Sequence, residues 1–235
     1  MKPNATISRL YQDMYAHSAL RAWRDAGAVS KADNVIRAHR AAGLPSAPRV
    51  IELGCGEGAL AAELLRRSFP GSYLGMDIST SGIEEARARA IPGADFRLTA
   101  GGHVDLADGC ADLAILSHVV EHLEHPRVLL YEAKRIASHV LVEVPLELHW
   151  RTPRDYHLDA LGHINKYTAR SIRHLAQSSG FEVLNQFTTN PGHARFGDAS
   201  LGRNLSWRVK DIALRTVPLA ARTCFTFHET LMLRS

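Results

Sequence analysis

Short apolar runs alternate with amphipathic segments over most of the chain. The apolar runs have the length and composition of buried strands, at residues 49–53, 73–76, 95–98, 112–116, 139–144 and 181–187. The segments between them repeat apolar positions at helical spacing, at residues 58–67, from about 81, 126–136 and 168–180. Strands that alternate with helices in this way predict right-handed crossovers, and therefore a mostly parallel sheet with helices on both faces.

The N-terminal region has a different pattern. Residues 5–43 predict helices, the second of them over about 30–42, and the glycine and prolines of 43–48 predict a linker. We therefore expect an N-terminal helical cap over residues 1–48 and one α/β domain over residues 49–235.

The last third of the chain departs from the strand–helix rhythm. We expect residues 145–170 and 190–222 to be insertions that cover a substrate. Residues 200–221 predict a basic amphipathic helix, and we expect it to pack as an ordinary surface helix. The alternative roles are a lid, a homodimer surface or a membrane-surface helix. The apolar stripe of this helix consists of Leu205, Val209 and Ile212. Residues 224–233 predict a last strand, and an antiparallel edge to the sheet.

The composition is that of a soluble globular protein. The chain has 235 residues, of which 46% are hydrophobic and 22% charged, and no apolar run approaches the roughly 18 residues of a membrane span. The N-terminus lacks the apolar core of a signal peptide, and the three cysteines lie too far apart for a disulfide framework, so we expect a cytoplasmic protein. The net charge of +4 permits an anionic ligand without requiring one.

A glycine-rich loop follows the first predicted strand. Gly54, Gly56 and Gly58 stand at alternate positions, where glycine allows conformations closed to other residues and lets a ligand approach the main chain. The next helix directs its N-terminal N–H groups at the same space. Asp77 ends the second predicted strand about 20 residues further on, where dinucleotide folds place an acidic residue that accepts the ribose hydroxyls. The combination predicts a nucleoside-containing cofactor at the carboxyl ends of the strands.

The loop differs from the fingerprint of dinucleotide-binding folds. That fingerprint spaces its glycines as G-x-G-x-x-G, whereas here the third glycine comes one residue early and Ala59 stands in its place. Glu52 precedes the loop, and its carboxylate would repel a pyrophosphate but could hold an amino group. These features favour a cationic cofactor with an amino-acid tail over a diphosphate.

Several segments resemble the class I S-adenosylmethionine-dependent methyltransferases, in particular their small-molecule and ubiquinone-type branch. They occur in the order of the family: ELGCGEG at 52–58, GMDIS at 75–79, DLAILSHVVEHL at 112–123, VEVP at 142–145, GHINKYT at 162–168 and SGFEV at 179–183. The resemblance implies a seven-stranded, mostly parallel Rossmann-like sheet. It also implies the cofactor S-adenosyl-L-methionine and the product S-adenosyl-L-homocysteine.

The same resemblance implies which residues bind the methionine part of the cofactor. Gly54, Gly56 and Gly58 would line it, Glu52 would orient it, and Ser117 would lie near its methionine end.

At the nucleoside end, Asp77 would accept the ribose hydroxyls and Ile78 would pack on the adenine. The family often has an acidic residue that contacts the adenine amino group, but that position falls at Gly102 in this chain. We therefore expect Asp105 or the main chain to replace that contact, or the contact to be absent.

His118 and His163 are the candidates for acid–base catalysis. His118 follows the fourth predicted strand, at the edge of the sheet where open α/β folds bind substrates, and His163 lies in the segment expected to cover that edge. A histidine that accepts the proton of a hydroxyl or amine acceptor typically accelerates such a reaction by about 10²- to 10⁴-fold.

The segment around His118 also has two possible metal interpretations. It fits the H-x-x-E-H signature of zinc proteases, but that motif requires a helix, and here it begins at the end of a strand. Ubiquinone-type and small-RNA methyltransferases hold a divalent cation with Glu-x-x-Glu-His at this place, and this chain retains Glu121 and His122, has His118 for the first glutamate, and could add His163. Imidazole in place of a carboxylate would favour softer ions than magnesium. We expect no metal, with the cation as the alternative.

The sequence therefore predicts an enzyme that transfers a methyl group from S-adenosylmethionine to an oxygen or nitrogen of a small molecule. The alternatives are an RNA methyltransferase and a non-catalytic protein that binds the cofactor. A nucleic-acid partner is disfavoured because the chain has neither a long basic tail nor an added RNA-binding module. The sequence does not identify the acceptor.

Overall fold

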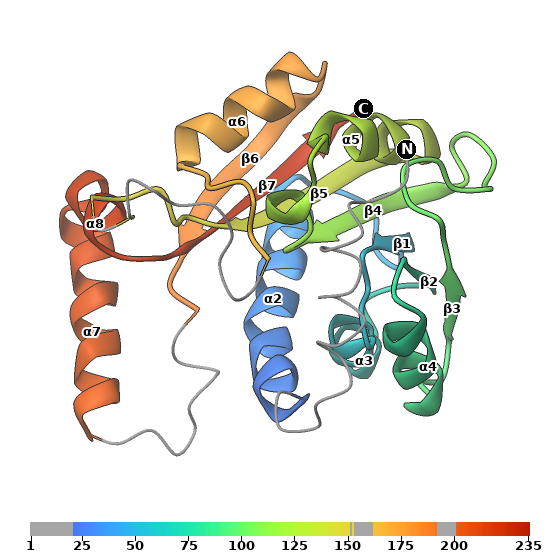
Figure 1. Ribbon diagram of the computed structural model, residues 1–235, viewed down its shortest axis with the longest axis horizontal. Helices are drawn as coiled ribbons and strands as arrows, with labels where there is room; N and C mark the ends of the chain where they lie inside the picture. Colours follow the sequence, from blue (N-terminus) through green and yellow to red (C-terminus); the bar gives the residue numbers. More distant parts are fainter. Residues whose placement is uncertain (1–20, 151, 153–161, 192–200) are drawn as a thin grey trace.

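A seven-stranded sheet lies at the centre of the computed structural model (Figure 1), which describes residues 21–150, 152, 162–191 and 201–235, apart from the side chains of 201–204. The strands lie in the order β3-β2-β1-β4-β5-β7-β6, which confirms the predicted fold class. Their bounds are Arg49–Leu53 (β1), Ser72–Asp77 (β2), Ala94–Leu98 (β3), Ala111–Ser117 (β4), Ala137–Pro145 (β5), Glu182–Thr189 (β6) and His228–Arg234 (β7).

Helices cover both faces of this sheet. Their bounds are Arg21–Ala41 (α2), Ala59–Arg66 (α3), Thr80–Ala88 (α4), Pro126–Ile136 (α5), Ala169–Ser178 (α6), Leu201–Thr216 (α7) and Pro218–Cys224 (α8), with a short 3-10 helix, η2, at Val120–His122. The part of the predicted N-terminal cap at residues 5–20 lies outside the described residues. The second predicted helix of the cap is α2, which begins nine residues before the predicted start at residue 30.

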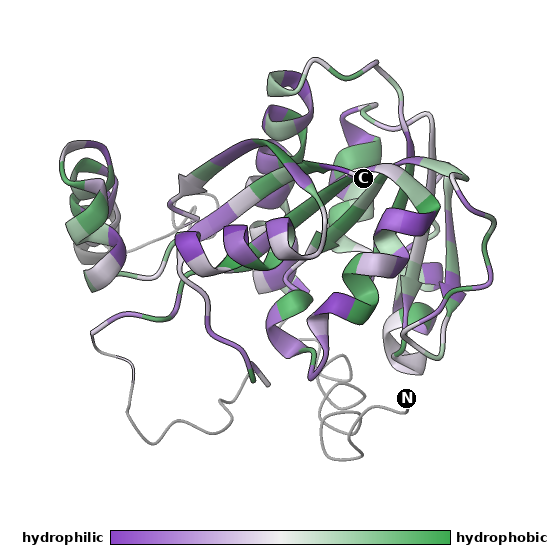
Figure 2. Ribbon diagram, turned by 90° about the horizontal axis from the view of Figure 1, so that it is seen from above, coloured by the Kyte–Doolittle hydropathy of each residue, from purple (hydrophilic) through white to green (hydrophobic). Residues whose placement is uncertain are grey.

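Alternate residues of each strand face opposite sides of the sheet, because side chains along a strand point to its two faces in turn. Ile51 and Leu53 of β1 pack in a core with α5 and α6, whereas Val50 packs in a second core with α2, α3 and α4. Figure 2 shows apolar residues concentrated along the central strands, and both polar and apolar residues on the surrounding helices. Both cores hold β1, β2 and β4 in place, and the carboxyl ends of these three strands carry the candidate site.

The sheet reverses direction at one strand among the described residues. β7 pairs antiparallel with β5 on one side and with β6 on the other, while the remaining pairs are parallel. The antiparallel pairing predicted for the last two strands is therefore confirmed, although β6 forms the edge and β7 lies inside it. The long connection through α7 and α8 allows the chain to return between β5 and β6 (Figure 1).

The helix predicted from about residue 81 begins at Thr80, but its predicted cap was wrong. The spacing of Ser81 and Glu84 predicts a capping box, whereas the N-cap of α4 is Ser79, whose hydroxyl accepts a hydrogen bond from the Gly82 N–H at 3.1 Å. Ser81 instead lies in the first turn, with its hydroxyl 3.1 Å from that of Ser79. Ser79 follows the end of β2 closely, so the helix begins as soon as the strand ends.

The basic helix predicted over residues 200–221 is two helices, because Pro218 cannot donate the backbone hydrogen bond that would continue α7. We expected this helix to pack on the domain through its apolar stripe. That expectation was wrong, because the stripe residues Leu205, Val209 and Ile212 are exposed. Ala213 and Leu214 of α7 pack instead against a small apolar cluster around Phe227.

None of the described helices combines the length and the apolar character needed to cross a membrane.

The start of α6 provides a test of local stability. Thr168 is its N-cap and accepts a hydrogen bond from the Ser171 N–H at 3.0 Å, while the Ser171 hydroxyl accepts one from the Thr168 N–H at 2.9 Å. We expect Thr168→Ala to lower the free energy of unfolding by about 1 kcal/mol, measured by urea denaturation. Thr168→Ser keeps the capping oxygen and should lose much less; equal losses in both variants would contradict the capping role.

Candidate active site

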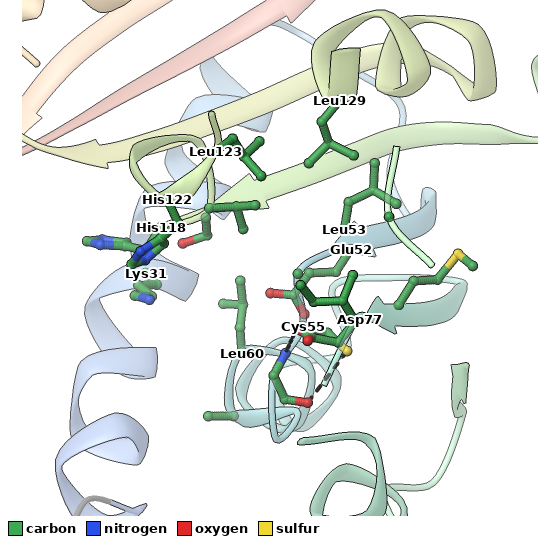
Figure 3. Close-up of a pocket in the computed structure, with 18 of the residues that line it drawn as sticks. Lys31, Glu52, Leu53, Cys55, Leu60, Asp77, His118, His122, Leu123 and Leu129 are labelled. Atoms are coloured by element: carbon green, nitrogen blue, oxygen red, sulfur yellow. Dashed lines mark hydrogen bonds between the residues drawn. The ribbon is translucent and has the colours of Figure 1, made fainter. Parts of the chain in front are cut away.

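A cavity of about 450 Å³ opens at the carboxyl ends of the central strands, within the range of small-molecule binding sites (Figure 3). It extends from the glycine loop and Asp77 to the histidines that follow β4 (Figure 3). The lining includes the predicted site residues Glu52, Gly54, Gly56, Asp77, Ile78, Ser117, His118 and His163. Residues from distant parts of the sequence therefore share one space, as the sequence predicts.

The first two glycines of the loop are required by their conformation and their surroundings. Gly54 has φ +86° and Gly56 has φ +52°, both in the left-handed region that favours glycine. A Cβ atom at Gly54 would lie 2.4 Å from a methyl group of Val119, so a side chain cannot be accommodated. The Gly54 N–H donates to the Met76 carbonyl at 2.7 Å, which fixes the loop to the end of β2.

Gly58 is the exception among the predicted cofactor residues, because it does not line the cavity. It is the N-cap of α3, with φ +76°, and a Cβ atom there would lie 3.0 Å from the Phe96 ring. Its structural role is thus the turn into α3 and the close packing of that turn on β3.

Asp77 is buried at the end of β2 and holds the glycine loop in shape. One carboxylate oxygen accepts the Gly56 N–H at 2.7 Å, and the other accepts the Ser79 N–H at 2.8 Å. Burial raises the pKa of Asp77, although these backbone hydrogen bonds act against the rise. Each carboxylate oxygen can accept more than one hydrogen bond, so both remain able to accept from a ligand in the cavity.

Glu52 lies at the floor of the cavity and is only 3% exposed. Its carboxyl group accepts a hydrogen bond from the Tyr73 hydroxyl. Burial raises the pKa of Glu52 to about 7, while the Tyr73 hydrogen bond and the charge of Lys31 act in the opposite direction. A carboxyl group of this kind can change its charge near neutral pH when a cationic group approaches.

Helix α2 contributes a wall that sequence reasoning missed: the lining residues Trp23, Arg24, Gly27, Ala28 and Lys31. Its attachment is electrostatic. Glu57 of the glycine loop is buried and accepts hydrogen bonds from Arg24 at 2.7 Å and from Arg89 of the segment after α4 at 2.8 Å. Figure 3 shows α2 along one side of the cavity, with Lys31 among the labelled lining residues. In the sequence, the charged Glu57 among the small residues of the loop was the feature that could have indicated an ion pair with another element.

A second missed feature surrounds His118. His118 follows β4 with φ +58°, a strained conformation for a residue with a side chain, and its Nε2 lies 3.3 Å from Nδ1 of His228. Glu143 of β5 is fully buried beside both rings, with Oε1 3.1 Å from His228 Nδ1 and 3.8 Å from His118 Nε2. Although burial acts to raise it, these two histidines hold the pKa of Glu143 well below its ordinary value. In the sequence, Glu143 within an otherwise apolar strand was the feature that could have indicated this cluster of His118, His228 and Glu143.

His163 is buried next to the same cavity and is oriented by a carboxylate. Its Nδ1 lies 2.7 Å from Oε2 of Glu147, which fixes the orientation of the ring beside the cavity. His122 lies close by, with its ring centroid 4.7 Å from that of His163 and its Nδ1 3.1 Å from the Gly162 carbonyl. Burial lowers the pKa of His122.

Three residues of the alternative cation site, Glu121, His122 and His163, come together, and the fourth, His118, contacts Glu121. One ligand atom from each of the three lies within 4.8 Å of the others, and Glu121 is fully buried, with Oε1 3.3 Å from His118 Nδ1. A buried carboxylate is costly unless donors or charges surround it, and a cation is one group that would satisfy it. The residues therefore fit the divalent cation that the ubiquinone-type resemblance implies.

At the nucleoside end, Ile78 and Gly102 line the cavity, whereas Asp105 is exposed and does not. Asp105 thus lies outside the place where the family's acidic residue would be expected, and the main chain around Gly102 is the remaining candidate for that contact. Ser117 is buried at the end of β4, where its hydroxyl donates to Glu143 at 3.3 Å.

Comparisons with known proteins identify the family of this chain. Residues 20–186 match the methyltransferase domain family. Phthiotriol/phenolphthiotriol dimycocerosates methyltransferase 1 of Mycobacterium ulcerans is 28% identical over 176 residues, which cover 68% of this chain and 62% of the relative. The chain thus spans less than two thirds of the length of that relative.

Solved structures share the fold at low sequence identity. Phospholethanolamine N-methyltransferase 2 of Haemonchus contortus, in complex with phosphomonomethylethanolamine and S-adenosylhomocysteine, has a TM-score of 0.61 and 14% identity, over 86% of this chain and 52% of that one. The [4+2]-cyclase SpnF has a TM-score of 0.61 and 16% identity, over 85% of this chain and 79% of that one.

The raised pKa of Glu52 predicts a pH-dependent cost of folding. As pH rises from 4.5 towards 7, the carboxyl group ionises in the unfolded chain before it ionises in the folded protein, so ionisation favours unfolding. We expect Glu52→Gln to gain stability relative to the unmodified chain over this interval, by up to about 3 kcal/mol. Urea denaturation at pH 5 and pH 7.5 measures the difference; a stability difference that does not change with pH would contradict the burial effect.

Proposed function

The chain belongs to the class I S-adenosylmethionine-dependent methyltransferases, and from this premise we propose that it transfers a methyl group from S-adenosylmethionine to an oxygen or nitrogen of a small molecule. The observation that carries the proposal is the continuous cavity. It joins a glycine loop and a buried aspartate, which suit the cofactor, to histidines that suit a methyl acceptor. The named relative from Mycobacterium ulcerans supports the choice of a small molecule over RNA.

The cofactor would lie along the carboxyl ends of β1 and β2. The left-handed glycines leave the main chain of the loop open, and the remaining lone pairs of Asp77 can accept the ribose hydroxyls. Glu52, at the floor of the cavity, is placed to attract the cationic part of the methionine moiety, and Ile78 offers an apolar surface to the adenine.

The acceptor would occupy the end of the cavity near His118 and His163. In the transfer, the acceptor lone pair forms a bond to the methyl carbon, while the sulfur–carbon bond of the cofactor breaks on the opposite side of that carbon. The acceptor proton passes to a histidine nitrogen, for which His163 is well prepared because Glu147 orients the ring. Most of the rate enhancement would come from holding the two reactants in line.

If the family's cation is bound, Glu121, His122 and His163 would hold it, and it would supply charge stabilisation to an acceptor oxygen. Proton acceptance would then depend on the remaining histidines of the cavity. Helix α2 would still close the cofactor end and limit the access of water.

A second candidate is binding of the cofactor without methyl transfer. The fold neighbour named as a [4+2]-cyclase supports it, because this architecture also carries a reaction of another class. Both candidates require cofactor binding, so an assay of transfer separates them.

We expect Asp77→Asn to weaken the binding of S-adenosylhomocysteine by roughly 10- to 150-fold in calorimetry, because hydrogen bonds to a charged group contribute about 1.5–3 kcal/mol. Asp112→Asn is the matched control, since Asp112 pairs with Arg49 at the amino ends of the strands, away from the cavity. Unchanged affinity in a folded Asp77→Asn variant would reject the ribose assignment.

We expect His163→Gln to lower kcat by about 10²- to 10⁴-fold, with little change in the affinity for S-adenosylhomocysteine. The assay measures transfer of a labelled methyl group from S-adenosylmethionine to a panel of small hydroxyl, carboxyl and amine compounds. His174→Gln, on the exposed surface of α6, is the control. An equal rate in both variants would reject the role of His163, and the absence of transfer by the unmodified chain to every acceptor would favour the second candidate.

A further inference from the structure

We propose that His118, His228 and Glu143 form a binding site for a zinc-like divalent cation at the acceptor end of the cavity. The ligand atoms are His118 Nε2, His228 Nδ1 and Glu143 Oε1, contributed by the ends of β4, β7 and β5. This ligand set shares only His118 with the cation site that the family motif suggests, and its other two members, Glu143 and His228, were not indicated by the sequence as ligands.

The separations between the three atoms suit a tetrahedral ion. His118 Nε2 lies 3.3 Å from His228 Nδ1, His228 Nδ1 lies 3.1 Å from Glu143 Oε1, and His118 Nε2 lies 3.8 Å from the same oxygen. Ligand atoms bonded to zinc at about 2.0–2.1 Å in tetrahedral directions lie about 3.3–3.4 Å apart. The observed distances scatter around that value, so an ion requires only small shifts of the side chains.

Protons join these three atoms in one arrangement only, in which His228 Nδ1–H donates to Glu143 and faces the lone pair of His118 Nε2. If His228 Nδ1 carries a hydrogen and donates it to Glu143, it cannot also accept a hydrogen bond from His118 Nε2. If both rings carry hydrogens on these atoms, two donors face each other at 3.3 Å. The distance from His118 Nε2 to Glu143 is too long for a hydrogen bond. A cation instead accepts lone pairs from all three atoms at once.

The surroundings of the three ligands resemble the outer shell of metal sites, in which each ligand is oriented by a further hydrogen bond or charge. His118 presents its other ring nitrogen, Nδ1, to Glu121 Oε1 at 3.3 Å. Glu143 accepts hydrogen bonds from Asn34 of α2 at 3.1 Å and from Ser117 at 3.3 Å.

The site is open on one side. His118 and His228 line the cavity, whereas Glu143 is fully buried behind them. Three protein ligands with a fourth position facing a cavity are typical of catalytic zinc sites, including sites with two histidines and a glutamate. An ion there would lower the pKa of a bound hydroxyl group, and so prepare an acceptor oxygen for methylation. This last step rests on the proposed function, whereas the binding of the ion does not.

The test uses the full chain and Co²⁺, whose visible absorption reports tetrahedral coordination, followed by competition with Zn²⁺. We expect one Co²⁺ with tetrahedral absorption, and an affinity lowered by about 100-fold or more in His228→Gln. His122→Gln is the matched control, because it removes a ligand of the neighbouring cluster and leaves the three proposed ligands intact. Binding of S-adenosylhomocysteine and circular dichroism check that each variant is folded.

Each outcome decides the proposal. Absorption that is lost in His228→Gln and kept in His122→Gln supports it. The absence of Co²⁺ binding in the unmodified chain, an equal loss in both variants, or a loss confined to His122→Gln overturns it. Should His228→Gln not fold, the anomalous signal of zinc in crystals of the unmodified chain gives the answer: an ion between His118 and His228 supports the site, and no ion there overturns it. Metal binding without methyl transfer would reject the proposed function alone.

Discussion

The hydrogen bond from the Gly56 N–H to the Asp77 carboxylate joins the ends of β1 and β2, and the candidate cofactor site depends on it. It is made by a buried carboxylate that also accepts the Ser79 N–H, so one side chain positions both the glycine loop and the start of α4. The glycines before it can adopt the required conformations only because they carry no side chain. The conformation of the glycine loop therefore leaves its main chain accessible to a ligand.

A second buried carboxylate organises the other end of the cavity. Glu143 is buried within the sheet, which is tolerable because Asn34 and Ser117 donate hydrogen bonds to it and two histidine rings lie beside it. The hydrogen bond to Asn34 also links β5 to α2. Helix α2 is thus held at both ends of the cavity, by Glu143 at one end and by the ion pair of Arg24 with Glu57 at the other.

The acceptor end concentrates more titratable groups than a single proton transfer needs. His118 lies between two buried carboxylates, Glu121 and Glu143, and faces His228. His163 and Glu147 form a separate pair in the same cavity. The first group suits a cation and the second suits a proton, so the two chemical tasks of an acceptor site can be divided between them.

The sequence by itself determined the strand–helix order, the glycine loop, and the positions of Asp77, Glu52 and His118, because these depend on local periodicity and on residue types that follow a strand directly. It also located the boundaries of α5 and the cap of α6, which local hydrogen bonds decide. Only the tertiary structure decided that β7 inserts beside β5 and brings His228 to His118, residues 110 positions apart. It likewise decided that α2 walls the cavity and that the apolar stripe of α7 stays exposed, because such contacts depend on which faces meet in space, and periodicity along the chain carries no information about the partner.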